Sequence, residues 1–124
     1  MPAKPIDVYE TLIDHKKHTE FTGSLATGER KVGGRFTAWD GYISGKNLVL
    51  DEGKRIVQEW KTTKWPAGYL PSIVEFSFKA KGSGTELTMV HSNVPAKQAD
   101  SYAQGWIDFY WKHMKKYFQR KSKH

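Results

Sequence analysis

Three polar side chains interrupt faces of the chain that are otherwise apolar. Gln58, His91 and His113 fall where the neighbours that share their face are hydrophobic. A buried polar group needs a hydrogen-bonding partner. We therefore expect His91 and His113 either to meet across a gap between a sheet and a helix or to offer one ring to the polar end of a ligand. A histidine satisfied within the core is the simpler interpretation, and a ring that stays partly hydrated would titrate near neutral pH.

Patterns typical of catalysis or metal binding are lacking in this sequence. His15 and His18 are three positions apart and could share a helical face, but no carboxylate or third histidine is placed beside them, so a metal site is not expected. No serine stands in a nucleophile-elbow setting, and the glycine-rich segment 28–34 lacks the Lys-Ser/Thr ending of a phosphate loop. The absence of cysteine excludes disulfides and thiolate metal sites. We expect a protein that is not an enzyme, with no cofactor.

Aromatic side chains form the largest candidate site. Strand alternation and helix periodicity place a set of inward-facing side chains between a concave sheet and a helix, where ligand cavities often lie. The expected lining is Phe36, Trp60, Phe76, Phe78, Met89, His91, Trp106 and Tyr110. The expected rim is Trp39, Trp65 and Tyr69. The same residues are suited to filling a core, so an open pocket and a packed interior both stay possible.

A long helix near the end of the chain must position half of this site. Residues 96–118 place aromatic side chains at helical spacing on one face and polar side chains on the other. The buried stripe is Ala99, Tyr102, Trp106, Tyr110, His113 and Tyr117, widened by Ala103, Ile107, Met114 and Phe118. Gly105 costs about 1 kcal/mol relative to alanine within a helix. Its presence predicts a close approach of a strand or loop to the helix backbone.

The middle of the chain shows the apolar–polar alternation of β-strands, and these strands must position the other half of the candidate site. A first helix opens at Pro5, with Ile6, Tyr9, Leu12 and Ile13 on one side, and gives way to a polar stretch. Strands are expected near 25–31 and over 35–40, 42–50, 55–64, 72–81 and 85–92. The short glycine-rich and Asp-Gly turns between them indicate an antiparallel meander. The predicted fold is α+β, a curved antiparallel sheet wrapped round the long C-terminal helix.

The composition is typical of one globular domain. The chain has 124 residues, 38% of them hydrophobic and 14% aromatic, and we expect a single domain over 1–124. No apolar run reaches the length of a membrane span, and residues 1–14 lack the apolar core of a signal peptide; a cytoplasmic protein is expected. The net charge of +7 is densest at the C-terminal end, where 119–124 form a basic tail. Cations there complement a helix dipole, so a nucleic-acid partner is not expected.

Eight short motifs follow one another along the chain. They are Phe21-Thr22-Gly23, Gly33-Gly34-Arg35-Phe36, Asp40-Gly41-Tyr42-Ile43-Ser44-Gly45, Ile56-Val57-Gln58-Glu59-Trp60, Trp65-Pro66, Gly84-Thr85-Glu86-Leu87, Val94-Pro95 and Gly105-Trp106. In this order they resemble the AHSA1 family, the activator of Hsp90 ATPase homologue 1-like proteins of the C-terminal-domain type. That family belongs to the START-like (Bet v 1-like, SRPBCC) superfamily. The resemblance implies the helix-grip fold, in agreement with the fold predicted from periodicity.

The resemblance also narrows the function. It implies a non-enzymatic binding protein that takes an apolar small molecule in the cavity or contacts a protein partner, with a weak contact to an Hsp90-type chaperone. Two alternatives remain: a START-like enzyme acting on a hydrophobic substrate, and a chaperone-associated stress protein that resembles an Hsp90 co-chaperone. A basic protein that binds nucleic acid or an acidic partner is a third class, suggested by the charge alone.

The start of the chain departs from the family pattern. The family fold begins with a strand, whereas here only Met1–Lys4 precede Pro5. The first strand is therefore expected to be short or absent, which would leave Thr85–Ser92 as an exposed edge. Because such an edge recruits another strand, either a homodimer joined through it or a cavity opened on that side is expected.

Overall fold

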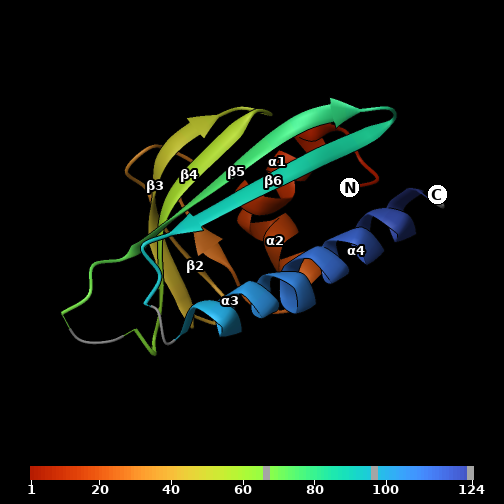
Figure 1. Ribbon diagram of the computed structural model, residues 1–124. Coiled ribbons are helices and arrows are strands. Elements are labelled where there is room, and N and C mark those ends of the chain that lie inside the picture. The colour runs from red at the N-terminus through yellow and green to blue at the C-terminus, as the bar shows by residue number, and fades with distance from the viewer. Residues whose placement is uncertain (66–67, 96–97, 123–124) are drawn as a thin grey trace.

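The computed structural model describes residues 1–65, 68–95 and 98–122, with side chains up to Arg120 (Figure 1). Two helices come first, α1 (Pro5–Ile13) and α2 (His15–Thr22). The strands are β1 (Thr27–Gly28), β2 (Arg35–Ala38), β3 (Ile43–Asp51), β4 (Arg55–Thr62), β5 (Ser72–Lys81) and β6 (Gly84–Ser92). The chain then forms α3 (Ala99–Gly105), a π-helical segment η2 (Trp106–Trp111) and α4 (Lys112–Ser122). Residue 96, the expected start of the long helix, and Pro66 of the Trp-Pro motif lie outside the described residues.

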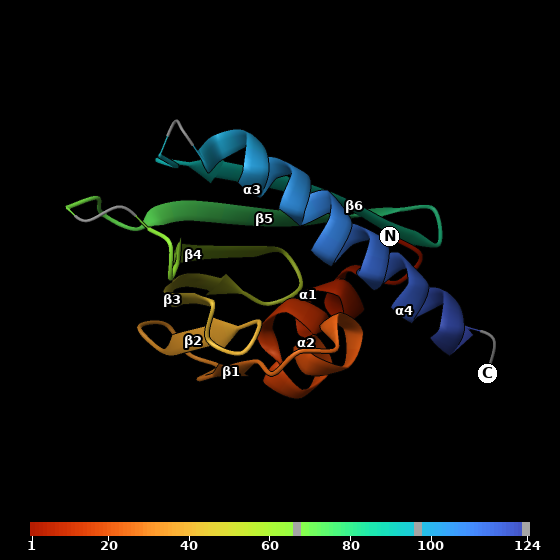
Figure 2. The same ribbon diagram turned by 90° about the horizontal axis from the view of Figure 1, so that it is seen from below.

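The strands form one sheet in the order of the sequence, and every neighbouring pair is antiparallel. This confirms the predicted meander and the α+β class. The sheet curves, and the helical run from α3 to α4 crosses its concave side while α1 and α2 fill one end (Figures 1 and 2). Each layer thus covers the apolar face of the other.

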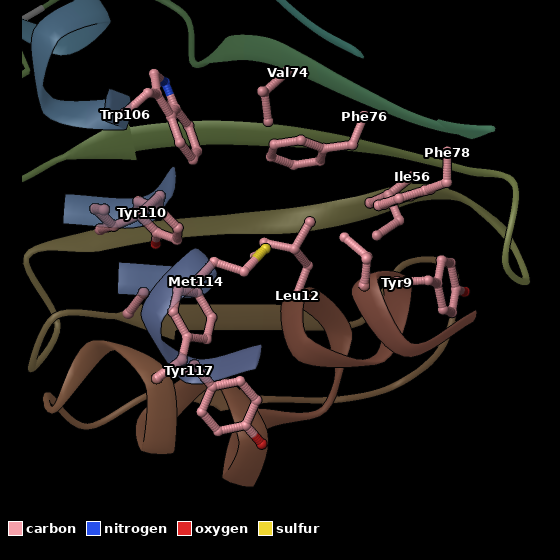
Figure 3. Packing of buried hydrophobic residues seen from close by; sticks show 14 of the residues in the cluster. Tyr9, Leu12, Ile56, Val74, Phe76, Phe78, Trp106, Tyr110, Met114 and Tyr117 are labelled. Atoms are coloured by element: carbon pink, nitrogen blue, oxygen red, sulfur yellow. The ribbon is translucent and has the colours of Figure 1, made fainter. Parts of the chain in front are cut away.

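The core lies where the sheet, α1 and the long helix meet. Tyr9 and Leu12 come from α1, Phe76 from β5, and Tyr110 and Met114 from the long helix; all are buried (Figure 3). Met114 and Phe76 are almost completely removed from solvent, at 0% and 2% exposure. Residues far apart in the sequence therefore share one core.

The long helix differs from the prediction in two ways. It continues to Ser122, so 119–122 extend α4, and its middle winds as a π-helix. A π-helix pairs residues i and i+5, so the 3.6-residue spacing is interrupted within Trp106–Trp111, whereas Met114 and Tyr117 beyond it stay buried. Trp106, Tyr110 and Met114 are buried as expected, but the placement of Ala103 and Ile107 in the buried stripe was wrong, because both are exposed.

Helix α2 was missed by the sequence reasoning, which placed a polar break there. The side chain of Asp14 accepts hydrogen bonds from the backbone N–H groups of Lys16 and Lys17, an N-cap that offsets the polar composition. Gly23, at φ 79°, ends the helix in the left-handed conformation. The helix buries His18 and Phe21 against the core.

Strand β6 forms one edge of the sheet, as predicted. Met1 pairs with the start of this strand: its amino group donates to the Thr85 carbonyl at 2.8 Å, and the Thr85 N–H donates to the Met1 carbonyl at 2.9 Å. The Thr85 hydroxyl also donates to the carbonyl of Ala3 at 2.6 Å. Among the described residues, this short contact is all that pairs with β6 on its outer side.

Candidate functional site

An open cavity of about 290 Å³ lies between the β2–β4 end of the sheet and the π-helical segment. Its walls are mostly aromatic. The lining residues are Trp39, Tyr42, Ile43, Trp60, Ser101, Tyr102, Gly105, Trp106, Phe109 and Tyr110. Figure 3 shows Trp106 and Tyr110 pointing from the helix toward the strands. The cavity is thus an apolar space with hydroxyl groups on its lining.

The turn between β2 and β3 builds one wall. Trp39 and Asp40 adopt left-handed backbone angles, at φ 53° and 57°. Asp40 holds the turn by exchanging two hydrogen bonds with the backbone of Leu25: its N–H donates at 3.0 Å and its carboxylate accepts at 2.9 Å. The Trp39 ring then packs edge-on against Phe109, with ring centres 5.6 Å apart. The predicted Asp-Gly turn therefore places an aromatic ring opposite the helix.

The π-helical segment builds the facing wall. Trp106, Phe109 and Tyr110 all border the cavity, and Trp106 also stacks on Trp111 with ring centres 5.6 Å apart. The extra residue in this turn lets both Tyr110 and Trp111 pack against Trp106. Such π-helical turns are rare and are often found at functional sites.

A hydrogen bond from Trp106 to His91 holds the Trp106 ring in place. The indole N–H of Trp106 donates to His91 Nδ1 at 3.1 Å, so the neutral ring carries its proton on Nε2. That Nε2–H donates to the Ser72 hydroxyl at 2.8 Å, and Ser72 donates to the carbonyl of Trp60 at 2.6 Å. Burial lowers the pKa of His91 from 6.5 to about 4. Both ring nitrogens are therefore used within the protein.

A second histidine supports Tyr110. The carbonyl of Leu12 lies 3.3 Å from His18 Nδ1 and can only accept, so His18 Nε2 accepts from the Tyr110 hydroxyl at 3.0 Å. Burial lowers the pKa of His18 to about 4 and raises the pKa of Tyr110. This pair is neutral at physiological pH and holds the Tyr110 ring in place as a wall of the cavity.

A chain of hydrogen bonds joins the start of α3 to the end of β4. The Tyr102 and Thr62 hydroxyls lie 2.6 Å apart, and Tyr102 donates to the side-chain carbonyl of Gln98 at 3.1 Å. The Gln98 amide donates to the carbonyl of Lys64 at 3.0 Å. Burial raises the pKa of Tyr102. These bonds fix the position of α3 over the cavity.

The family model described as Activator of Hsp90 ATPase homolog 1-like protein matches residues 2–119. The chain belongs to this family.

Individual relatives agree with the assignment. The Homo sapiens activator of 90 kDa heat shock protein ATPase homolog 1 is 32% identical over 116 residues, which cover 94% of this chain and 34% of that protein. A crystal structure of an HSP90 activator from Plasmodium falciparum has a TM-score of 0.86 at 26% identity and covers 94% of this chain and 89% of that one. The solution structure of the Aha1 dimer from Colwellia psychrerythraea has a TM-score of 0.70 at 16% identity, covering 88% and 84%, and shows the fold alone. The chain spans about a third or less of the curated activators that it matches.

Part of the predicted lining of this AHSA1-family chain surrounds the cavity. Trp60, Trp106 and Tyr110 line it, and Trp39 of the predicted rim does too. Sequence reasoning did not place Tyr42, Ile43, Ser101, Tyr102, Gly105 and Phe109 in the lining. For Phe109 a signal was present, because it stands three residues after Trp106 and seven after Tyr102, which is the spacing of one helical face. Which of these residues touch a ligand remains a prediction.

Other predicted lining residues lie elsewhere. Phe76 and Phe78 are buried in the core, where Phe76 packs against Trp106 and Phe78 against Tyr9. Met89 borders a separate groove beside β6. Phe36 packs against the core and borders a small hollow near α1 and α2. None of these four residues is part of the cavity lining.

Two predicted rim residues lie beside the cavity without lining it. Trp65 packs against Trp60 and Tyr102, with ring centres 6.1 and 5.7 Å apart, and its indole N–H donates to the carbonyl of Leu70. Tyr69 is 59% exposed. The Trp65 ring therefore packs behind the cavity wall, and Tyr69 faces solvent.

The polar residues singled out in the sequence have structural partners. The expected meeting of His91 and His113 was wrong: His91 bonds to Ser72 and Trp106, whereas the ring of His113 packs edge-on against Trp39. Nor does His91 line the cavity.

Gln58 is also satisfied. Its side-chain amide donates to the Asn47 side-chain carbonyl at 2.9 Å, and the Asn47 amide donates to the carbonyls of Glu29 and Lys31 at 2.9 and 3.3 Å. This network ties the segment before β2 to the sheet. Within the described ranges, no three His, Cys, Asp or Glu side chains are grouped as a metal site, and no helix is long and apolar enough to cross a membrane.

Proposed function

We propose that this AHSA1-family chain is a non-enzymatic binding protein whose cavity takes a compact, largely aromatic small molecule. The observation that carries the proposal is the aromatic cavity of about 290 Å³ walled by the π-helical turn. Pockets for small molecules begin at about 300 Å³, so the ligand has one or two rings. Tyr42 and Ser101 border the cavity and carry hydroxyl groups. Because Tyr42 already hydrogen-bonds to Tyr102, Ser101 is the group proposed to bind the polar end of the ligand.

The state of the neighbouring titratable groups supports binding over catalysis. General acid–base catalysis needs a group whose pKa lies near the working pH and that reaches the substrate. His18 and His91 instead have pKa values of about 4 and bond within the protein. The hydroxyls of Tyr102 and Tyr110 are likewise bonded to protein groups. These polar groups fix the walls of the cavity.

A titration with 2-naphthol, followed by quenching of tryptophan fluorescence, tests the proposal. Saturable binding is expected. Ser101 lies on the cavity wall at an exposed position of α3, so Ser101→Leu should fill the space without disturbing the core and weaken binding by about tenfold, or 1.4 kcal/mol.

Gln104→Leu is the matched control, because Gln104 is exposed on the same helix and does not line the cavity. Its affinity should equal that of the unmodified protein. Lack of saturable binding, or equal effects of the two leucine variants, would contradict a ligand site in this cavity.

A contact with an Hsp90-type chaperone is the second candidate function. It is favoured by one observation: the Plasmodium falciparum HSP90 activator is covered over 89% of its chain by this fold, at 26% identity. We propose a weak contact, without large stimulation of the chaperone ATPase by this chain alone. An ATPase assay at equimolar chain and Hsp90 measures this, and strong stimulation would refute the proposal.

A further inference from the structure

The outer side of β6 offers unpaired backbone groups in a regular series. In an antiparallel strand, both backbone groups of one residue point to the same side, and successive residues alternate. Thr85 directs its N–H and carbonyl to Met1. Leu87, Met89 and His91 therefore direct theirs to that same side, and across the described part of the chain no strand pairs with them.

A groove of about 600 Å³ runs beside this edge. It is bordered by Met1, Lys81, Thr85, Glu86, Leu87, Met89, Trp111 and Lys115. In Figure 2, β6 and the long helix separate toward the C-terminal end of α4, and Figure 1 shows the N-terminus between them. Leu87, Met89 and Trp111 are half-buried and form its apolar part.

One end of the groove carries two lysines that form no ion pair with the described residues. They are Lys81 and Lys115, which border the groove near Met1. Burial and the charge of Lys115 lower the pKa of the Met1 amino group. Glu86 is the single carboxylate on the groove border in the described residues. An acidic group from a partner would neutralise this end.

We propose that the groove binds an extended peptide that adds a strand to β6. Such strand addition takes its affinity from backbone hydrogen bonds and its specificity from pockets for alternate side chains. Pairing along 87–91 needs about 17 Å of peptide, or five residues. The side chains opposite Leu87, Met89 and His91 share the face of those residues, so apolar groups at these positions fit against Trp111.

Charge fixes the direction of the peptide. Met1 pairs antiparallel to Thr85, and an antiparallel peptide continuing that ladder ends with its C-terminus beside Lys81 and Lys115. Acidic residues or a free carboxylate at that end meet the two lysines. A parallel peptide would place its amino terminus there, where the charges repel.

A second copy of this chain fits the groove less well. The antiparallel β6 pairing that is symmetric about Met89 sets Leu87 opposite His91 of the second copy. That pairing brings the Ser92 end of the second copy to the two lysines, so their charge stays unmatched. The net charge of +7 on each chain also opposes self-association. An acidic peptide can pair with the free backbone groups of β6 and also neutralise the charge of the two lysines.

The test uses the fluorescein-labelled peptide Val-Thr-Leu-Thr-Val-Asp-Asp with a free C-terminus. Saturable binding is expected by fluorescence anisotropy, with amide signals of Leu87, Met89 and His91 gaining protection from hydrogen exchange. Replacing the peptide leucine by proline removes a pairing N–H and should abolish binding. Replacing Asp-Asp by Lys-Lys should weaken it at least about tenfold.

Variants of the protein separate the contribution of backbone pairing at β6 from the contribution of the lysine charge to peptide binding. Met89→Pro removes an outward N–H at an edge position, where proline is tolerated, and should abolish binding, whereas Met89→Leu should retain it. Lys115→Glu should weaken binding about fivefold. Lys61→Glu, at an exposed site on β4 outside the groove, makes the same charge change and should have no effect.

Three results would overturn the proposal. Absence of saturable binding does so, as does binding that Lys115→Glu and Met89→Pro both leave unchanged in folded protein. Protection of the Leu87–His91 amides without peptide, together with a dimer in sedimentation, would assign the edge to a second copy. The naphthol titration addresses the other cavity, so its outcome tests the proposed small-molecule site separately from this groove.

Discussion

Gly105→Ala distinguishes a glycine required by packing from a glycine that keeps the cavity open. The sequence predicted a close approach of a strand or loop to its backbone, but that prediction was wrong: apart from the flanking residues and the helix backbone, an added Cβ would meet only Phe109 Cδ2 of the same helical run, at 3.8 Å. Gly105 has ordinary helical angles, φ −59° and ψ −41°, and lines the cavity. Alanine therefore fits the helix and places a methyl group at the cavity wall.

The magnitude follows from helix propensity. Alanine is better than glycine by about 1 kcal/mol within a helix, and a contact at 3.8 Å is a favourable van der Waals distance. With an unfolding entropy of about 2.1 cal/mol/K per residue over 124 residues, this raises Tm by about 4 °C. Naphthol affinity should fall by about threefold, because the methyl group occupies part of the space.

Thermal unfolding by circular dichroism and the naphthol titration measure the two effects. Ala103→Gly is a matched control: it makes the reverse exchange at an exposed position of α3 outside the cavity lining. It should lower Tm by about the same amount without changing affinity. A loss of stability in Gly105→Ala would refute the account of this glycine, as would unchanged naphthol affinity.

Three further predictions concern titration, the buried tyrosine and the basic end. Because folding lowers the pKa values of His18 and His91 from 6.5 to about 4, their contribution to stability is complete above pH 6.5 and is lost as the pH falls toward 4. Tm should therefore decrease between pH 7 and pH 4.5, and a constant Tm would contradict burial of these rings as neutral groups. Tyr110→Phe leaves His18 Nε2 without its donor and should lower the free energy of unfolding in urea by about 1–3 kcal/mol; an unchanged value would argue against this bond. A short DNA duplex should bind weakly at low salt and not at physiological salt, whereas tight, sequence-selective binding there would support a nucleic-acid partner.

The sheet and the long helix were predictable because their signals are local and periodic. Ser72–Lys81 alternates without interruption and forms β5 with the predicted bounds. Trp106, Tyr110, Met114 and Tyr117 repeat at helical spacing, and all four are buried. The order of short turns then left few alternatives to a meander.

The details of the site depend on features that periodicity does not report. The segment Trp106–Trp111 is apolar at nearly every position, so its sequence does not show where an extra residue enters the helix. His18 lies in a stretch of charged residues, and its burial depends on the Asp14 cap and on Tyr110, 92 positions away. The three- and four-residue spacing of His18, Phe21 and Thr22 was the available sign of a buried face.

The indole N–H signals in a two-dimensional NMR titration with 2-naphthol test the cavity most directly. Trp39, Trp60 and Trp106 line it, whereas Trp65 lies beside it and Trp111 borders the groove. The account predicts saturable shifts that are largest for Trp39, Trp60 and Trp106 and that are lost together in Ser101→Leu. Shifts centred on Trp111, or no saturable shift at any of the three cavity indoles, would contradict a binding site beneath the π-helical turn.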